Sequence, residues 1–171
     1  RHSWNILKAD GPSALIRSSR RELARRLSRG MWDYYQFEMR GLVQPYDLST
    51  DAWQANAALL AQNRGPLQIK TIAWFLPEFS NPYYGGSYTI LRYANFLKTQ
   101  KGIDSQFVIV NPRSEPQVMS QRIAGAFPAL AGAPLQPVWE LNQVPGLLTA
   151  DAAVASLWNT AYYLFHYNQT R

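Results

Sequence analysis

Residues 67–110 read LQIKTIAWFLPEFSNPYYGGSYTILRYANFLKTQKGIDSQFVIV, and this stretch decides the fold of the chain. Its first ten residues are largely apolar and rich in β-formers until Pro77 ends the run, which predicts a buried strand of a parallel sheet. Residues 87–101 predict a helix capped by Gly102, because apolar side chains recur at helical spacing at Ile90, Leu91, Ala94 and Leu97. Residues 105–110 form a second apolar run. The stretch therefore predicts a strand, helix, strand unit with right-handed parallel pairing.

The residues after this unit continue the same alternation. Residues 115–126 predict a second helix, and residues 129–137 a connection of small residues broken by prolines. An edge strand is expected around 138–141, whereas 150–158 is the better strand candidate. Asn159 or Thr160 would then cap a final helix over 161–167. We expect a Rossmann-like α/β domain over residues 67–171, a parallel sheet flanked by helices, that is cut before its last strand or strands.

Residues 1–66 predict a helical amino-terminal extension. A basic amphipathic helix is expected around residues 13–29, with leucines on one face and arginines largely off it, at Arg20, Arg21, Arg25, Arg26 and Arg29. A second helix is predicted from Ser49 or Thr50 up to Gly65. The arginines admit three interpretations, in this order: a solvated helix face, contact with an anionic membrane surface, and nucleic-acid binding. The third is disfavoured because no aromatic platform accompanies the arginines, so no nucleic-acid partner is expected.

The composition fits one folded domain and excludes several classes of protein. The chain has 171 residues, 47% of them hydrophobic and 16% charged, which excludes intrinsic disorder. No apolar run approaches the roughly 20 residues that a spanning helix needs. The absence of cysteine excludes disulfides, thiolate metal sites and a thiol nucleophile. With no apolar leader segment at its start, the protein is expected in the cytoplasm, at the inner face of the cell membrane if the arginine helix binds lipid.

The most specific feature is the glycine pair that follows the first predicted strand. In open α/β sheets, ligands bind beyond the carboxyl ends of the strands. Gly85 and Gly86 let a ligand approach the backbone with no Cβ in the way, and the amide groups and dipole of the helix favour a phosphate there. The alternative is that the pair only makes the tight turn into the helix. The spacing does not separate the two, because it is not the dinucleotide fingerprint.

Motifs on both sides of this loop carry a resemblance to a known family. The segments IAWFLPEF at 72–79, NPYYGG at 81–86 and TILRYA at 89–94 are similar to the amino-terminal domain of WsaF-like rhamnosyltransferases. The segment ADAAVASLWNTAY at 150–162 looks like the later strand and helix of that family, so the resemblance covers most of residues 68–171. The glycine loop resembles GT-B glycosyltransferases more broadly. Those commonly carry His after the helix-ending glycine, where this chain has Ile103, which favours the narrower relatives.

The resemblance implies one half of a bacterial GT-B glycosyltransferase for polysaccharide biosynthesis. This chain would be the acceptor-binding domain, inactive alone, and a carboxy-terminal domain of the same protein would hold the nucleotide sugar, dTDP-rhamnose. The acceptor would be a glycan or a lipid-linked sugar. Gly85, Gly86 and Ser87 would line the cleft against the donor diphosphate, and no cofactor or metal is expected. Two alternatives stay open: a stand-alone module that binds a nucleotide or sugar phosphate, and a peripheral membrane adaptor.

Single side chains near the loop carry further expectations. Glu78 is a candidate general base for an acceptor hydroxyl, although such a residue more often caps or pairs. Aromatic rings suited to stacking on an acceptor sugar, or to ordinary packing, occur at Tyr83, Tyr84, Tyr88 and Trp158. Asp151 precedes its predicted strand, which places it at the wrong end for a cleft and favours a structural role. His2 and His166 are too far apart in sequence to suggest a metal site.

Overall fold

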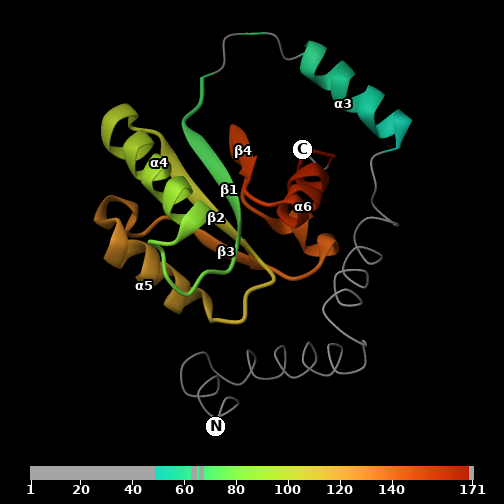
Figure 1. Ribbon diagram of the computed structural model, residues 1–171. Coiled ribbons are helices and arrows are strands. Elements are labelled where there is room, and N and C mark those ends of the chain that lie inside the picture. The colour runs from blue at the N-terminus through green and yellow to red at the C-terminus, as the bar shows by residue number, and fades with distance from the viewer. Residues whose placement is uncertain (1–48, 63–64, 66–67, 170–171) are drawn as a thin grey trace, which may run out of the picture. The chain divides into compact units, whose positions relative to one another are not determined.

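The computed structural model describes residues 49–62, 65 and 68–169, which fall into two compact units divided between Gln68 and Ile69 (Figure 1). The described part of the first unit contains helix α3 (Thr50–Gln62). The Ser49 hydroxyl accepts a hydrogen bond from the Ala52 amide at 3.1 Å, which is the arrangement of an N-cap. The helix predicted to begin at Ser49 or Thr50 is therefore confirmed. The basic helix and its arginines lie outside the described residues.

The second unit is built on a four-stranded parallel sheet. Its strands are β1 (Thr71–Pro77), β2 (Asp104–Val110), β3 (Leu135–Val138) and β4 (Ala152–Ala155), in the order β3-β2-β1-β4. All three strand pairs are parallel, with Trp74 opposite Phe107 on β2 and Val154 on β4. This order is that of the first four strands of a Rossmann sheet. The predicted α/β class and the central strand, helix, strand unit are confirmed.

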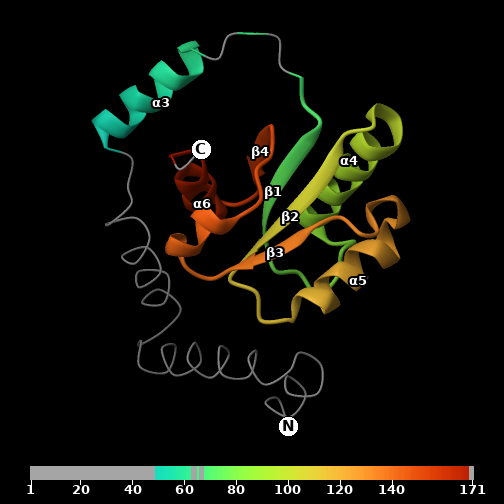
Figure 2. The same ribbon diagram turned by 180° about the vertical axis from the view of Figure 1, so that it is seen from behind.

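Helices α4 (Gly85–Lys101) and α5 (Pro116–Ala126) cover one face of the sheet (Figures 1 and 2). Alternate residues of β1 and β2 point to this face and form its core with the apolar stripes of the helices, including Trp74, Phe107, Leu91 and Ile123. Trp74 donates its indole N–H to the Ser105 hydroxyl at 3.0 Å, which satisfies the polar atom of a buried ring. The apolar stripe predicted for residues 87–101 therefore packs on the sheet.

The opposite face carries helix α6 (Trp158–Gln169) and the short 3-10 helix η2 (Leu141–Gly146) (Figure 2). Phe75, which is fully buried, packs edge-on against the ring of Tyr167, with centroids 5.5 Å apart. The Tyr167 hydroxyl donates to the Leu148 carbonyl at 2.8 Å. Both faces of the sheet are covered, as expected for strands that read as continuous apolar runs.

Two sequence predictions in the carboxy-terminal half were wrong. Residues 135–138 form strand β3 instead of a broken connection, and the edge strand ends where it was expected to begin. Pro137 fits because β3 is an edge strand, which leaves one of its sides without ladder partners. Helix α6 begins at Trp158, so neither Asn159 nor Thr160 precedes it as a cap. The Thr160 hydroxyl oxygen instead accepts hydrogen bonds from the amides of the preceding residues Ser156 and Leu157, at 3.1 and 3.0 Å.

Candidate functional site

The carboxyl ends of the strands gather the loops and helix starts at one edge of the sheet, here called the carboxyl edge. Helix α4 begins there on one face, at Gly85, and α6 begins there on the other, at Trp158. The strand order reverses direction between β1 and β4, which makes a topological switch point. Ser156 donates both its amide and its hydroxyl to the Phe75 carbonyl, at 3.2 and 3.1 Å, and so ties the two strand ends together.

The glycine pair lies open to solvent at this edge. A Cβ built on Gly85 or Gly86 would meet no atom within 4 Å, and both residues are exposed. Gly85 has a φ of +50°, so the backbone itself favours glycine there, whereas Gly86 has no such requirement. The preceding residue, Tyr84, gives the helix no side-chain cap. The first amides of α4, at Gly85, Gly86 and Ser87, have no partner within the helix and can donate to a ligand.

The predicted aromatic residues divide into exposed rings and packed rings. Tyr84 is 73% exposed and Tyr83 57%, next to the glycine pair on one side of β1. Trp158 is 42% exposed at the start of α6, on the other face of the sheet. Tyr88 is half-buried and lies between the rings of Tyr83 and Phe127, at centroid distances of 6.1 and 5.9 Å. Tyr83, Tyr84 and Trp158 therefore present ring surface for stacking, and Tyr88 contributes more to packing.

Glu78 braces two loops at the carboxyl edge. Its carboxylate accepts the amides of Arg113 and Ser114, at 2.7 and 3.0 Å, and the Ser114 hydroxyl. The guanidinium of Arg122 lies 3.9 Å from the same carboxylate and donates to the Phe79 carbonyl at 3.1 Å. These contacts join the loop after β1 to the loop after β2 and to α5. Glu78 therefore makes the capping and pairing contacts that were expected as its commoner role. Its role as a general base stays a prediction.

Asp151 has a structural role at the opposite edge of the sheet, where the strands begin, here called the amino edge. One carboxylate oxygen accepts the amides of Lys70 and Thr71, both at 2.9 Å, and the Asp151 amide donates to the Thr71 carbonyl at 3.0 Å. The hydrogen bond from the Lys70 amide, followed by that from Thr71, lowers the pKa of this carboxyl below its usual value. The contacts fasten the start of β4 to the start of β1, which is where a residue preceding the strand was expected to act.

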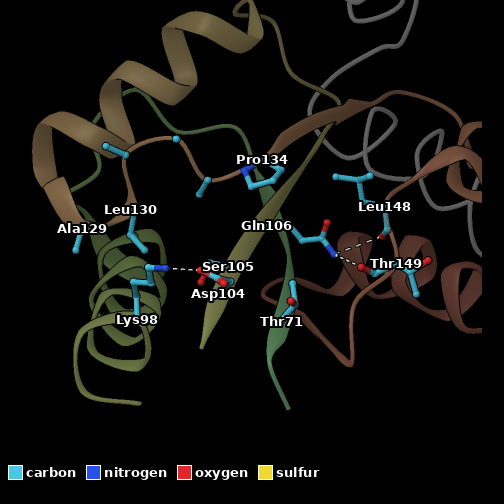
Figure 3. Close-up of a pocket in the computed structure, with 13 residues that line it drawn as sticks. Thr71, Lys98, Asp104, Ser105, Gln106, Ala129, Leu130, Pro134, Leu148 and Thr149 are labelled. Carbon is cyan, nitrogen blue, oxygen red and sulfur yellow. Dashed lines mark hydrogen bonds and ion pairs between the residues drawn. The ribbon is translucent and has the colours of Figure 1, made fainter. Parts of the chain in front are cut away.

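The amino edge also carries a cavity of about 470 Å³, shown in Figure 3. Its walls include the first residues of β1 and β2, the turn at 129–134, and Leu148 and Thr149. Gln106, only 3% exposed, donates its side-chain amide to the carbonyls of Thr149 and Leu148, at 3.0 and 3.4 Å. This hollow lies at the end of the sheet away from the glycine pair, so it is not the site that the glycine loop predicts.

Sequence reasoning did not place two asparagines of the carboxyl edge among the site residues, although it named Asn159 as a candidate helix cap. Asn111 follows β2 with a φ of +53°, and its amide donates to the Tyr163 hydroxyl at 3.3 Å. Asn159, on the first turn of α6, has a buried side-chain oxygen that accepts no hydrogen bond. The signal for Asn111 was present, because Asn is the residue most tolerant of positive φ after glycine and it directly follows an apolar run. The state of Asn159 depends on its surroundings and has no sequence signal.

Two further features are absent from the residues that the structure describes. Within residues 49–62 and 68–169, no group of three His, Asp or Glu side chains is placed to hold a metal ion. Over the same part of the chain, no helix has both the length and the apolar character needed to cross a bilayer.

Comparison with known proteins shows a similarity to a protein of polysaccharide biosynthesis. The chain is 32% identical over 124 residues to the O-antigen biosynthesis protein RfbC of Myxococcus xanthus. The matched region is 72% of this chain and only 10% of the relative, so this chain corresponds to a small part of that protein. No family model matches the chain, and no solved structure gives a significant match.

Proposed function

We propose that this chain is the acceptor-binding half of a GT-B glycosyltransferase in polysaccharide biosynthesis. It transfers rhamnose from dTDP-rhamnose to a glycan or lipid-linked acceptor, together with a nucleotide-sugar-binding domain carboxy-terminal to it. The observation that carries the proposal is the similarity to a protein named for O-antigen biosynthesis, over most of this chain. The Rossmann-like strand order supports it, since a GT-B enzyme faces two such sheets across a cleft.

The open start of α4 supports the place given to the donor. Its amides and the positive end of its dipole suit the diphosphate of a nucleotide sugar. Gly86 strengthens this, because the residue has ordinary backbone geometry and open space around it. A side chain would be tolerated by the fold at this position, so the missing Cβ leaves room for a ligand. The exposed rings of Tyr83, Tyr84 and Trp158 would stack on the acceptor.

The experiment is a transfer assay on the longer protein that contains this chain, alongside the 171-residue chain alone. Release of dTDP from dTDP-rhamnose is measured with lipid-linked and soluble glycan acceptors. We expect turnover by the longer protein and none by the chain alone. Turnover by the chain alone would contradict the division between acceptor and donor halves, and the absence of transfer from any nucleotide sugar by the longer protein would contradict the function.

A second candidate is a stand-alone module that binds a nucleotide or sugar phosphate. The uncapped first turn of α4 favours it, because this feature needs no second domain to bind a phosphate. Calorimetry of the 171-residue chain with dTDP and with dTDP-rhamnose separates the two functions. Micromolar binding by the chain alone supports the module. Binding that needs the longer protein supports the glycosyltransferase half.

A further inference from the structure

Arg122 of helix α5 contacts the two loops that follow β1 and β2. One guanidinium nitrogen, Nη1, donates to the Phe79 carbonyl at 3.1 Å and to the Ser114 hydroxyl at 3.2 Å. The same nitrogen lies 3.9 Å from the Glu78 carboxylate. Only 26% of the Arg122 side chain is exposed, and a charged donor withdrawn from water holds its acceptors more firmly than one at an open surface. Arg122 therefore fixes both loops relative to α5.

The place of Arg122 in α5 explains how one side chain reaches both loops. The helix begins at Pro116, at the carboxyl edge, so Arg122 lies nearly two turns into it. Side chains of a helix tilt toward its N-terminus, which directs the long arginine back to the edge where the loops lie. Nη1 carries two N–H groups, so it can donate to a carbonyl of one loop and to a hydroxyl of the other.

Residues 78–84 form the loop that leads from β1 to the candidate substrate groups. The Phe79 ring is buried at the start of this loop, and the Phe79 carbonyl is the acceptor for Arg122. Further along, the Asn81 side-chain oxygen accepts the Tyr83 amide at 2.9 Å, and the Asn81 carbonyl accepts the Tyr84 amide at 3.4 Å. These bonds make a compact turn, and the glycine pair follows it directly.

The bond from Arg122 is the outermost hydrogen bond between the main chain of this loop and the rest of the sheet unit. Past Phe79, the hydrogen bonds that the loop makes among the described residues stay within it or lead into α4. The loop also reaches the surface there, because Tyr83 and Tyr84 are exposed. A shift of the Phe79 carbonyl would therefore move the exposed rings and the turn that leads into α4.

We propose that Arg122 is a positioning residue: by holding the Phe79 carbonyl, it sets the place of Tyr83, Tyr84 and the glycine pair against the substrates. The inference rests on the proposed function and adds a side chain that contacts neither the donor nor the acceptor. Binding groups must be held within about 0.5 Å of their productive places, so a loop released at its start would bind both substrates less tightly.

The substitution Arg122→Met tests the proposal, because methionine retains an apolar stem and has no N–H donor. In the longer protein we expect the KM for acceptor and the KM for donor to rise about tenfold or more. Partial unfolding gives a different result, since it lowers turnover in proportion to the folded fraction and leaves both KM values unchanged.

Two further variants complete the kinetic test. Arg122→Lys keeps a charged donor and should recover part of the loss in substrate binding, and it provides the measurement if Arg122→Met does not fold. Arg92→Met, at an exposed arginine of α4, is the matched control and should leave both KM values unchanged.

A measurement on the 171-residue chain detects the position of the loop without a transfer assay. The backbone amide signals of Gly85 and Gly86 in a nitrogen–proton correlation spectrum report the conformation at the end of the loop. We expect Arg122→Met to move both signals. Arg92→Met should leave them in place, although Arg92 is closer to the glycine pair in sequence.

The proposal fails if the Arg122 variants lose turnover with both KM values unchanged, or if the two glycine signals stay where they are in the parent. Movement of the glycine signals in a protein whose longer form transfers no sugar would contradict the proposed function and leave the positioning of the loop intact. Sugar transfer with unchanged KM values in the variants would leave the function intact and remove this role from Arg122.

Discussion

At the amino edge of the sheet the carboxamide of Gln106 donates to two carbonyls, whereas at the carboxyl edge the carboxamide oxygen of Asn159 has no donor. The amino edge holds the cavity of about 470 Å³, yet its polar groups, such as Asp151, are tied into the fold. The carboxyl edge has an open glycine pair, exposed rings and a first helical turn without a side-chain cap. The comparison teaches that the largest hollow of a sheet can be lined by polar groups already tied into the fold, while polar groups without partners lie at its other end.

The largest effect is expected from Gln106→Ala at the amino edge. The substitution leaves two carbonyls without their donor and empties space around a side chain that is 3% exposed. We expect the free energy of unfolding to fall by about 3 kcal/mol. Urea denaturation measures it, with Gln100→Ala on the exposed side of α4 as the control that stays within about 0.5 kcal/mol. A loss below 1 kcal/mol, on the order of a surface change, would show that the amino edge is not the tied-down region described here.

A smaller loss is expected from Glu78→Ala, which removes a brace at the carboxyl edge. The amides of Arg113 and Ser114 lose their acceptor, so the free energy of unfolding should fall by about 2 kcal/mol. Glu78→Gln keeps one acceptor oxygen and should recover part of this stability. A transfer assay tells a brace from a base: a base requires Glu78→Gln to lose nearly all turnover, whereas a brace predicts that much of the turnover remains.

Glycines at the two ends of α4 separate two effects of substitution: the cost of a positive φ and the loss of free space around the backbone. Gly85 and Gly102 both have positive φ, at +50° and +67°, so alanine at either position should cost about 1 kcal/mol of stability. Gly86→Ala should cost nothing, because the backbone there is ordinary and the Cβ meets no atom. Under the proposed function, Gly86→Ala nevertheless lowers transfer by about tenfold by obstructing the donor. Gly102→Ala is the control that loses stability and retains transfer, and equal transfer by Gly86→Ala and the parent would disprove the role of the open pair.

The smallest effect is expected from Asp151→Asn, and it depends on pH. The pKa of Asp151 is lowered in the folded protein, so the carboxylate stabilises the fold above its unfolded value of 3.8, and this stabilisation is lost as the pH falls through the folded pKa. The parent should therefore lose more stability than Asp151→Asn between about pH 6 and about pH 3. Thermal midpoints of both proteins across this range measure the difference. Parallel curves would mean that the contacts with Lys70 and Thr71 do not depend on the charge.

Local patterns predicted the centre of the sheet well and its margins poorly. The strand over Thr71–Pro77 was evident because a strand covered on both faces is a continuous apolar run. Strand β3 was missed because the mostly small residues at 129–133 and the two prolines after them are typical of a connection, and only the position of β3 at the edge makes Pro137 acceptable. Asn159 was interpreted as a cap because Asn commonly precedes helices, and the helix in fact begins one residue earlier.

The sequence by itself determined the α/β class, the parallel pairing of the central strands and the glycine pair at the start of α4. These follow from the spacing of apolar residues and from the backbone freedom of glycine, which are local properties. Only the tertiary structure decided that Glu78 braces a loop 35 residues away, that Gln106 is satisfied and that Asn159 is not. The physical reason is that a hydrogen bond forms only when donor and acceptor come within about 3 Å of each other. The folding of distant segments sets that distance.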